Sequence, residues 1–538
     1  MNGSFEAEFD YVIVGGGSAG CVLAARLSED ASNEVLLIEA GGRDWNPFIL
    51  VPAGIKQIGR SYDWNYVTEK DNSRNGVADV WPAGKVLGGG SSVNGMVWVR
   101  GQPADYTEWE RMGATGWGYD DVLPYFIRSE RYEIPDSPNR GYSGPTWVGP
   151  VRVDHFTTQT FLAAAQDAGY PYNHDYNSGD QFGATRIQVN QRRGWRWSTA
   201  RAYLAPAMRR ANLAVRVHAT VNRVTISRGR ATGVEYRDPK NGVHTVRARK
   251  EVLLTAGALG TPKLLLLSGI GPEKALHARG VKVSQPSAEV GHNLQEHPLT
   301  AFLHRVNLRT LNRELNLRGM TKHGFDFVAH GRGAVTSPAT HAMVFMRDDS
   351  GRTNIQSFFA PFGVVSERNG AGYDVHAVKL LREFSTTGYA CLLHPRSRGR
   401  VELRSSQPDQ PPVITHSLLG DQTDVDGLRD AARRTQDIFR QPQFARLVIE
   451  EMKPASSVKT DDEWNEYLAR NTIGARHPVG TARMGEDDGA PVDTCLRVRG
   501  VEGLRVADAS VMPTLPSGNT NAPTVMIAER AAELIRRP

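Results

Sequence analysis

Three glycines near the start of the sequence have the spacing of a dinucleotide-binding turn. They follow the apolar run FDYVIV at residues 9–14 and precede the periodic stretch CVLAARLSED. Glycine there permits a tight turn, close approach of a pyrophosphate and close packing of helix on strand. The helix that follows would offer free backbone N–H groups to the phosphates. We therefore expect a diphosphate to bind at Gly15, Gly17, Ser18, Ala19 and Gly20.

An acidic residue completes this pattern. Glu39 follows the apolar run at residues 35–38 and lies about 20 residues beyond Gly20. Its carboxylate can accept a hydrogen bond from a ribose hydroxyl and disfavours a 2′-phosphate. Residues 9–39 thus predict a strand–helix–strand unit that places Glu39 and Ala40 at the adenosine end. The pattern does not distinguish NAD from FAD, and its alternative is an ordinary glycine-rich turn.

A second glycine-rich element, WPAGKVLGGGSSVNGM, lies at residues 81–96. From Gly88 to Ser92 its backbone can lie against a flat or anionic ligand. This element and GALGTPKLLLLSGIG at residues 257–271 resemble the two signatures of the glucose–methanol–choline (GMC) oxidoreductase family. Family-like stretches continue along the chain at GWRWSTARAYL (194–204), GHNLQEHP (291–298), HPRSRGRVEL (394–403), HPVGTARMG (477–485) and residues 503–535. The resemblance is weakest from about residue 305 to 390.

The resemblance implies FAD rather than NAD and the oxidation of an alcohol. It also implies an α/β fold in which a Rossmann-like FAD-binding domain carries an inserted α+β substrate-binding domain. Nucleotide-type elements at both ends and in the middle of the chain agree with a discontinuous domain. We expect residues 1–155, 212–304 and 472–538 to form the FAD-binding domain, and residues 156–211 and 305–471 to form the substrate-binding domain.

The same resemblance implies the catalytic pair. It places the catalytic histidine of the family at His477, in HPVGT, and its partner at Asn519, in PSGNTN. Imidazole, with a usual pKa near ~6.5, suits a base that takes the hydroxyl proton while hydride leaves for flavin N5. Asn519 would hold the alcohol oxygen by a hydrogen bond.

The resemblance implies further contacts to FAD. Val221 would contact the adenine through its backbone, and residues 94–97 would lie in the flavin region. The expected cofactor residues beyond the first motif are Val86, Gly88, Gly89, Ser91, Asn94, Gly95, Met96, Val97, Val221, Ala256, Gly257, Asp508, Ala509 and Asn521. Some family members attach flavin covalently through a histidine just before the asparagine of this signature. Here that position is Val93, so we expect non-covalent FAD.

Several functions remain open at this stage. Electrons from the alcohol could pass to O₂, as in an oxidase, or to a quinone or another acceptor, as in a dehydrogenase. A hydroxynitrile lyase-type activity or a non-enzymatic flavin-binding module would use the same fold. Choline is an alternative substrate to aliphatic, aryl and furanic alcohols. We expect choline to be a poor substrate, because binding it calls for an aromatic cage or a buried carboxylate.

Composition excludes other classes of protein. The 538 residues are 40% hydrophobic and 23% charged, which predicts a globular protein. A net charge of +6 without a block of like charge argues against nucleic-acid binding. Three distant cysteines, Cys21, Cys391 and Cys495, and the absence of CxxC or HExxH patterns predict neither a disulfide scaffold nor a metal site. No apolar run is long enough to span a bilayer, and no signal peptide is recognisable, so we expect a cytoplasmic protein.

One basic segment has two interpretations. Residues 305–332 contain Arg305, Arg309, Arg313, Arg318, Lys322 and Arg332 against Glu314 and Asp326, interleaved with leucines that include Leu315. The segment is either a solvated flap over the substrate entrance or a peripheral surface for an acidic membrane or an acceptor protein.

Two other histidines in family-like stretches, His297 and His394, are interpreted as structural residues that tie down loops.

Overall fold

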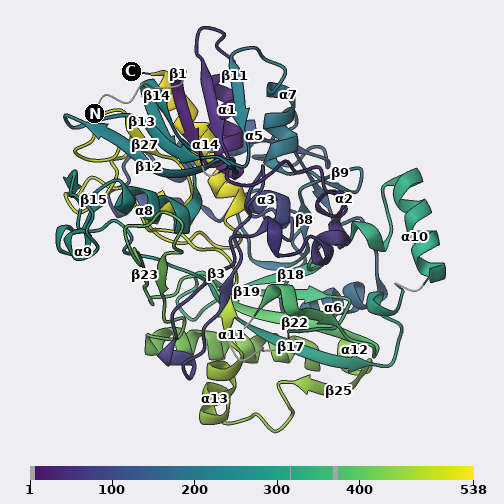
Figure 1. Cartoon of the computed structure of the whole chain (residues 1–538). Coiled ribbons are helices and arrows are strands. Elements are labelled where there is room, and N and C mark those ends of the chain that lie inside the picture. The colour runs from purple at the N-terminus through teal and green to yellow at the C-terminus, as the bar shows by residue number, and fades with distance from the viewer. Residues whose placement is uncertain (1–6, 241, 315–316, 367–373, 538) are drawn as a thin grey trace.

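Two seven-stranded sheets organise the chain in the computed structural model, which describes residues 7–240, 242–314, 317–366 and 374–537 (Figure 1). The first sheet has the order β11–β2–β1–β14–β13–β12, with β27 beside β14. Its strands are β11 (Leu213–Arg216), β2 (Val35–Ile38), β1 (Ala7–Val14), β14 (Val243–Leu254), β13 (Arg230–Arg237), β12 (Thr220–Ser227) and β27 (Leu504–Val506). The strands predicted at 9–14 and 35–38 are confirmed.

The parallel strands of this sheet explain where a ligand can bind. β11, β2, β1, β14 and β27 run parallel to one another, whereas β13 is antiparallel to β14, so the carboxyl ends of these five strands share one edge. Helices α1 (Ser18–Leu27), α8 (Gly257–Leu267) and α14 (Asn521–Arg536) begin shortly after β1, β14 and β27. The free N–H groups of three helix N-termini are therefore gathered at one edge of the sheet.

The second sheet is antiparallel and lies below the first in Figure 1. Its order is β25–β17–β22–β19–β18–β7, with β26 beside β17. Helices α6 (Phe156–Asp167) and α11 (Gln422–Arg440) pack on it, and Phe161, Phe359 and Phe439 form part of the buried core between them. The strands are β25 (Val448–Lys453), β17 (Pro298–Val306), β22 (Ser385–Leu392), β19 (Thr353–Ala360), β18 (Ala342–Arg347), β7 (Gly183–Arg186) and β26 (Ile473–Gly474).

The remaining strands form small sheets of two or three strands. The helices are α2 (Pro47–Leu50), α3 (Gly90–Val93), α4 (Pro103–Arg111), α5 (Tyr119–Ser129), α7 (Ala205–Ala207), α9 (Glu273–Ala278), α10 (Leu317–His330), α12 (Pro442–Ala445) and α13 (Asp461–Asn471). The short helical turns used below are η1 (Pro52–Gln57), η5 (Leu311–Arg313) and η6 (Ala334–Thr336). The short strands are β3 (Tyr66–Val67), β4 (Val80–Trp81), β5 (Glu130–Tyr132), β6 (Thr146–Pro150), β8 (Gln188–Val189), β9 (Gln191–Arg192), β10 (Trp195–Arg196), β15 (Ile270–Gly271), β16 (Gln285–Pro286), β20 (Val364–Ser366), β21 (Val378–Leu380), β23 (Arg400–Glu402) and β24 (Val413–Thr415).

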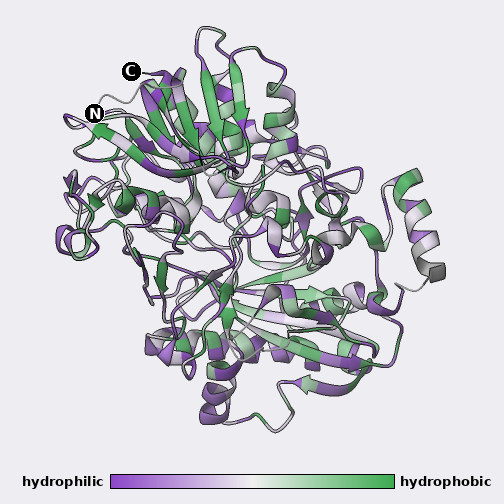
Figure 2. Cartoon of the chain, in the orientation of Figure 1, coloured by the Kyte–Doolittle hydropathy of each residue, from purple (hydrophilic) through white to green (hydrophobic). Residues whose placement is uncertain are grey.

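Hydropathy follows these layers, since apolar residues concentrate in the strands of both sheets (Figure 2). The α/β class with a Rossmann-like first sheet is confirmed. The division into the two predicted domains stays a prediction, although its boundary at residue 304 falls inside β17 of the second sheet. Among the described helices, none is both long and apolar enough to cross a bilayer. Cys21 and Cys391 are buried, Cys495 is half-buried, and all three are free thiols.

Candidate functional site

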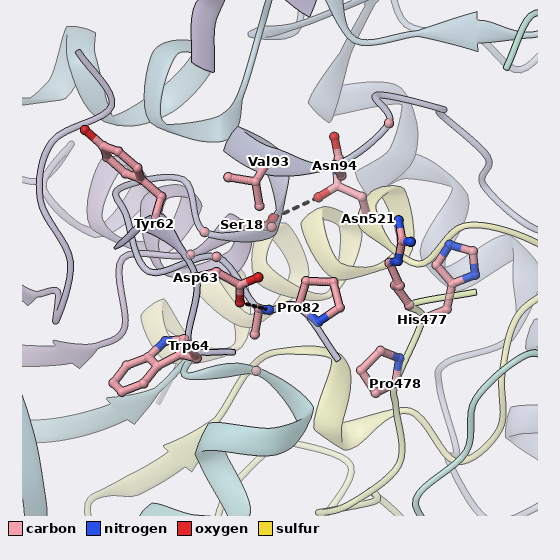
Figure 3. Close-up of a pocket in the computed structure, with 18 of the residues that line it drawn as sticks. Ser18, Tyr62, Asp63, Trp64, Pro82, Val93, Asn94, His477, Pro478 and Asn521 are labelled. Carbon is pink, nitrogen blue, oxygen red and sulfur yellow. Dashed lines mark hydrogen bonds between the residues drawn. The ribbon is translucent and has the colours of Figure 1, made fainter. Parts of the chain in front are cut away.

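A cavity of about 770 Å³ runs from the carboxyl edge of the first sheet to the second sheet. Its lining includes Gly15 and Gly17 after β1 and Glu39 after β2, and reaches Phe358 and Tyr389 of the second sheet. Figure 3 shows Tyr62 and Trp64 at one end and His477 and Pro478 at the other. Residues from both ends and from the middle of the chain line this cavity, and the motifs come from the same three regions.

The first glycine turn has the close contacts that its motif implies. Gly15 has a φ of +102°, and a Cβ there would lie 2.7 Å from the carbonyl oxygen of Thr255. A Cβ on Gly20 would lie 1.9 Å from the carbonyl oxygen of Gly15, so helix α1 meets the turn too closely for any side chain. Gly17 instead faces the cavity, with no atom closer than 3.8 Å to its Cβ position.

Glu39 lies in the cavity wall with both carboxylate oxygens hydrogen bonded. The backbone N–H of Gly16 donates to Oε2 at 2.8 Å, and that of Gly41 donates to Oε1 at 2.7 Å. Burial raises the pKa of Glu39 to about 7, although these backbone donors oppose the rise. Each oxygen keeps a further lone pair, so a ribose hydroxyl can still donate to it.

Side chains tie the three helix N-termini together. Ser18 Oγ donates to Asn521 Oδ1 at 2.8 Å, which joins the starts of α1 and α14 (Figure 3). Asp508 Oδ2 accepts from the backbone N–H of Gly257 at 2.8 Å and from Thr261 Oγ1 at 2.6 Å, which fixes the start of α8. Burial raises the pKa of Asp508, and the donors around it oppose the rise. The arrangement suits a diphosphate between the helices.

The second glycine-rich element packs directly on the first. Gly89 has a φ of +50°, and a Cβ there would lie 2.7 Å from the Cα of Gly17. The backbone N–H of Gly88 donates to the carbonyl oxygen of Gly16 at 2.7 Å. This contact positions the segment that follows, so that Val93, Asn94, Gly95, Met96 and Val97 line the cavity.

Most of the expected cofactor residues line this cavity. They are Gly15, Gly17, Ser18, Ala19, Glu39, Ala40, Gly89, Asn94, Gly95, Met96, Val97, Val221, Ala256, Gly257, Asp508, Ala509 and Asn521. Gly20, Val86, Gly88 and Ser91 lie outside the lining. Gly20 allows α1 to approach the turn, Val86 is fully buried, and Ser91 Oγ donates to the carbonyl oxygen of Gly88 at 2.6 Å. These four residues therefore support the cavity wall without facing the cavity.

Sequence reasoning missed a buried arginine in this wall. Arg196 Nη1 donates to the carbonyl oxygen of Asn94 at 2.7 Å and to its Oδ1 at 3.1 Å, and Arg196 Nε donates to the carbonyl oxygen of Ile49 at 2.9 Å. Burial lowers the pKa of Arg196 to about 9. The only available signal was its place in the family-like stretch GWRWSTARAYL, which does not indicate a contact with Asn94.

His477 and Asn519 meet at the far end of the cavity. Asn519 Nδ2 lies 2.9 Å from His477 Nε2, and both residues line the cavity. His477 follows the short strand β26, and Asn519 precedes α14, so the edges of both sheets position the pair. Burial, and then the neighbouring His297 and Arg476, hold the pKa of His477 well below its usual range. The imidazole is therefore neutral at pH 7 and can accept a proton.

A buried acid and a second histidine support His477 from behind. His297 Nδ1 lies 3.0 Å from His477 Nδ1. Glu296 accepts the backbone N–H of His477 at 2.8 Å and that of His297 at 2.9 Å. Burial lowers the pKa of His297 to about 4 and raises that of Glu296 to about 8. His297 thus contacts the catalytic candidate directly, beyond the loop-tying role expected for it, whereas His394 contacts Ser517 Oγ at 3.0 Å.

The wall opposite the first sheet is apolar and aromatic. We define the apolar wall as Leu299, Leu311, Phe358, Phe362, Tyr389 and Ile473, all of which line the cavity. Among the described residues, the carboxylates of the lining are Glu39, Asp63 and Asp508. Glu39 and Asp508 lie at the edge of the first sheet, and Asp63 contacts His376 Nε2 at 2.8 Å. The described part of the apolar wall therefore contains no acidic side chain, whereas Arg476 lines the cavity beside His477.

Comparisons with known proteins agree with this geometry. Family models described as GMC oxidoreductase match residues 9–299 and 395–528. The chain is 38% identical to the oxygen-dependent choline dehydrogenase of Vibrio vulnificus (strain YJ016), over 98% of this chain and 94% of the relative. The corresponding enzyme of Sinorhizobium medicae (strain WSM419) is also 38% identical, over 98% and 95% of the two chains.

The fold is also similar to that of solved oxidase structures. Pyridoxine 4-oxidase from Mesorbium loti superposes with a TM-score of 0.88 at 31% identity, covering 98% of this chain and 99% of that one. A formate oxidase of Aspergillus oryzae RIB40, studied for modification of its FAD, superposes with a TM-score of 0.91 at 27% identity, covering 99% of each chain.

Proposed function

Because this chain belongs to the GMC oxidoreductase family and binds FAD, we propose that it oxidises an uncharged primary alcohol, aliphatic, aryl or furanic, to the aldehyde. The observation that carries the proposal is the contact of His477 Nε2 with the Asn519 amide, in a cavity with an apolar wall. A base and a hydrogen-bond donor at one end of a cavity with an apolar wall suit an alcohol whose remainder is uncharged.

The described residues fit FAD. A Cβ at Gly15, Gly20 or Gly89 would collide with the backbone. Glycine at these positions therefore lets the turns pack closely at the strand edge, where a diphosphate would bind. The N-termini of α1, α8 and α14 supply N–H groups, and Glu39 supplies an acceptor for the ribose. When bound, FAD supplies the acceptor for the hydride that leaves the carbinol carbon.

His477 is proposed as the general base. Its neutral imidazole takes the hydroxyl proton at Nε2, the nitrogen that accepts from the Asn519 amide when no alcohol is bound. The alcohol hydroxyl would replace that amide hydrogen as the donor to Nε2. The Nδ1 side is held by His297, and the backbone of His477 is held by the Glu296 carboxylate. These contacts fix the ring, so little rotational freedom remains to be lost when the alcohol binds.

Asn519 is proposed to hold the alcohol oxygen. Its amide nitrogen carries two hydrogens, of which one is used by His477 Nε2. The other can be donated to the alcohol oxygen as negative charge develops there. Among the described residues, no group hydrogen bonds Asn519 Oδ1, which is buried. The amide therefore has capacity left for the substrate.

We also propose that FAD is held without a covalent bond at Val93. Valine lines the cavity at this position and has no nucleophilic atom. Acid precipitation of the purified protein should leave the yellow flavin in the supernatant. Flavin that stays with the precipitated protein would contradict the proposal.

Choline oxidation is the second candidate, and the names of the relatives favour it. The lack of a carboxylate in the described part of the apolar wall and the nearby Arg476 favour an uncharged substrate instead, because they leave a buried quaternary ammonium without a counter-charge. Anaerobic bleaching of bound FAD with choline, hexanol, benzyl alcohol and furanic alcohols separates the candidates. Bleaching by any of these alcohols excludes a purely lyase-type activity. The peroxide formed per turnover in air then distinguishes O₂ from a quinone-type acceptor.

A further inference from the structure

Helix α10 stands apart from the two sheets at one side of the molecule (Figure 1). Its inner face is anchored, because Phe327 is buried and its ring lies 4.5 Å from that of Trp195. His323 adds a contact of 3.1 Å to Glu314. The outer face carries Phe325, which is 68% exposed, and Val328, which is 82% exposed. The helix is therefore fixed to the body while two large apolar side chains face solvent.

These side chains form one stripe. Phe325, Val328 and Ala329 are related by spacings of three and four residues, which place them on the same face of a helix. All three are exposed. Leu315, one of the leucines noted in the sequence, lies outside the described residues.

Three further exposed aromatic side chains lie on segments that connect to α10 through short turns. Trp195 on β10, Phe48 on α2 and Trp45 just before α2 are 40%, 47% and 69% exposed. α2 contacts β10 and η1, while η6 contacts both η1 and α10. Figure 1 places α2, β9 and α10 on the same side of the molecule. We define the apolar patch as Trp45, Phe48, Trp195, Phe325 and Val328. Exposed apolar side chains that gather on one side of a molecule are typical of interaction sites.

Basic side chains lie on α10 and on the segments next to it. The exposed ones on α10 and the adjoining turns are Arg193, Arg309, Arg313, Lys322 and Arg332. None of them forms an ion pair with a described carboxylate. Arg305, by contrast, pairs with Glu450 at 2.9 Å, and the side chain of Arg318 lies outside the description. Of the two nearby acids, Glu314 contacts His323 and Asp326 lies 4.0 Å from His330, so the five basic side chains exceed the acids. The face therefore has uncompensated positive charge.

We propose that α10 and the apolar patch dock on an anionic membrane surface. Aromatic side chains would enter the boundary between headgroups and acyl chains, and the lysine and arginines would lie on the lipid phosphates. The same face borders the cavity, because Pro52 and Ala53 of η1 and Ala334 of η6 line it. An apolar alcohol or acceptor dissolved in the membrane would thus reach the cavity without crossing water. The proposal stands independently of the substrate proposed above.

Flotation of the FAD-loaded full chain with lipid vesicles tests this surface. Vesicles of phosphatidylcholine mixed equally with phosphatidylglycerol should carry the protein upward, and vesicles of phosphatidylcholine alone should not. Raising the ionic strength to about 1 M, where the screening length is about 3 Å, should release it. Protein that stays below the anionic vesicles at low salt would overturn the proposal.

Matched variants locate the contact. Phe325→Ser with Val328→Ser should abolish flotation, whereas Ile449→Ser, at a residue 52% exposed on β25, should not. Lys322→Glu with Arg332→Glu should weaken vesicle binding at least tenfold, since each basic residue near the surface contributes about fivefold. Lys274→Glu with Lys282→Glu, at exposed positions on and just after α9, should have little effect.

Two readouts keep the variants interpretable. Unchanged flavin content and melting temperature show that each variant is folded. Equal flotation of the wild type and the Phe325→Ser/Val328→Ser variant would overturn the proposal. So would a wild-type dimer in the absence of lipid that this double variant converts to a monomer, because the patch would then be a contact between copies.

Discussion

The imidazoles of His297 and His477 meet edge to face, with their Nδ1 atoms 3.0 Å apart and their ring planes at 83°. The Asn519 amide nitrogen can only donate, so His477 Nε2 is the acceptor of that contact. In the neutral ring the hydrogen is then on Nδ1, which donates to His297 Nδ1. The pair of contacts therefore fixes one tautomer, in which Nε2 is the basic nitrogen and its lone pair accepts from the Asn519 amide.

The pH dependence of flavin reduction should follow the neutral form of His477. Because burial, and then the neighbouring His297 and Arg476, hold the pKa of His477 well below its usual range, the base is already deprotonated at pH 7. The rate at saturating alcohol should rise from acid pH to a plateau, with a midpoint below the usual ~6.5 of imidazole. Anaerobic stopped-flow traces across a pH series measure this. A rate that keeps rising well above pH 7 would contradict the assignment.

Replacing Glu39 by alanine should weaken FAD retention without slowing the chemical step. The carboxylate lies at the strand edge, far along the cavity from His477, and a charge-assisted hydrogen bond contributes roughly 1.5–3 kcal/mol. FAD affinity should fall roughly tenfold to a hundredfold. Titration of the apoprotein with FAD measures the loss, and Glu39→Gln, which keeps one acceptor oxygen, should lose less. Full FAD occupancy with a slow reductive half-reaction would show that Glu39 does not bind the ribose.

Choline should be oxidised less efficiently than benzyl alcohol or hexanol, because the apolar wall gives its ammonium no counter-charge. Leu299→Glu places a carboxylate in that wall. It should raise the ratio of kcat/KM for choline to that for benzyl alcohol about tenfold, which corresponds to about 1.4 kcal/mol. Leu299→Gln is the uncharged control and should leave the ratio unchanged. Wild-type enzyme that prefers choline would refute the uncharged-substrate proposal.

Local patterns made the nucleotide edge predictable. The turn at Gly15 and the acid at Glu39 are separated by one helix and one strand, so spacing alone places them together. The strands at 9–14 and 35–38 and the helix that starts at Ser18 are found where apolar periodicity indicates them. The expected roles of individual cofactor residues stay predictions, although most of those residues line the cavity.

Contacts between distant segments could not be predicted in this way. His297 and His477 are 180 residues apart, and nothing in either stretch indicates that two buried imidazoles touch. Arg196 and Asn94 are 102 residues apart and likewise meet only because two short segments pack together. The apolar wall draws Phe358 and Tyr389 from the region where the family resemblance is weakest. Its character therefore depends on the register of the second sheet, which the sequence pattern does not specify.

The central claim is that His477 takes the hydroxyl proton, and His477→Ala tests it most directly, with Asn519→Ala as its companion. Loss of a general base typically costs 10²–10⁴ in rate, while the FAD contacts at the first sheet remain. Anaerobic stopped-flow measurement of flavin bleaching should show His477→Ala with full FAD occupancy and a reduction rate lower by about that factor. Asn519→Ala should lose less, because the proton acceptor survives. A His477→Ala enzyme that reduces its FAD at the wild-type rate would contradict the account.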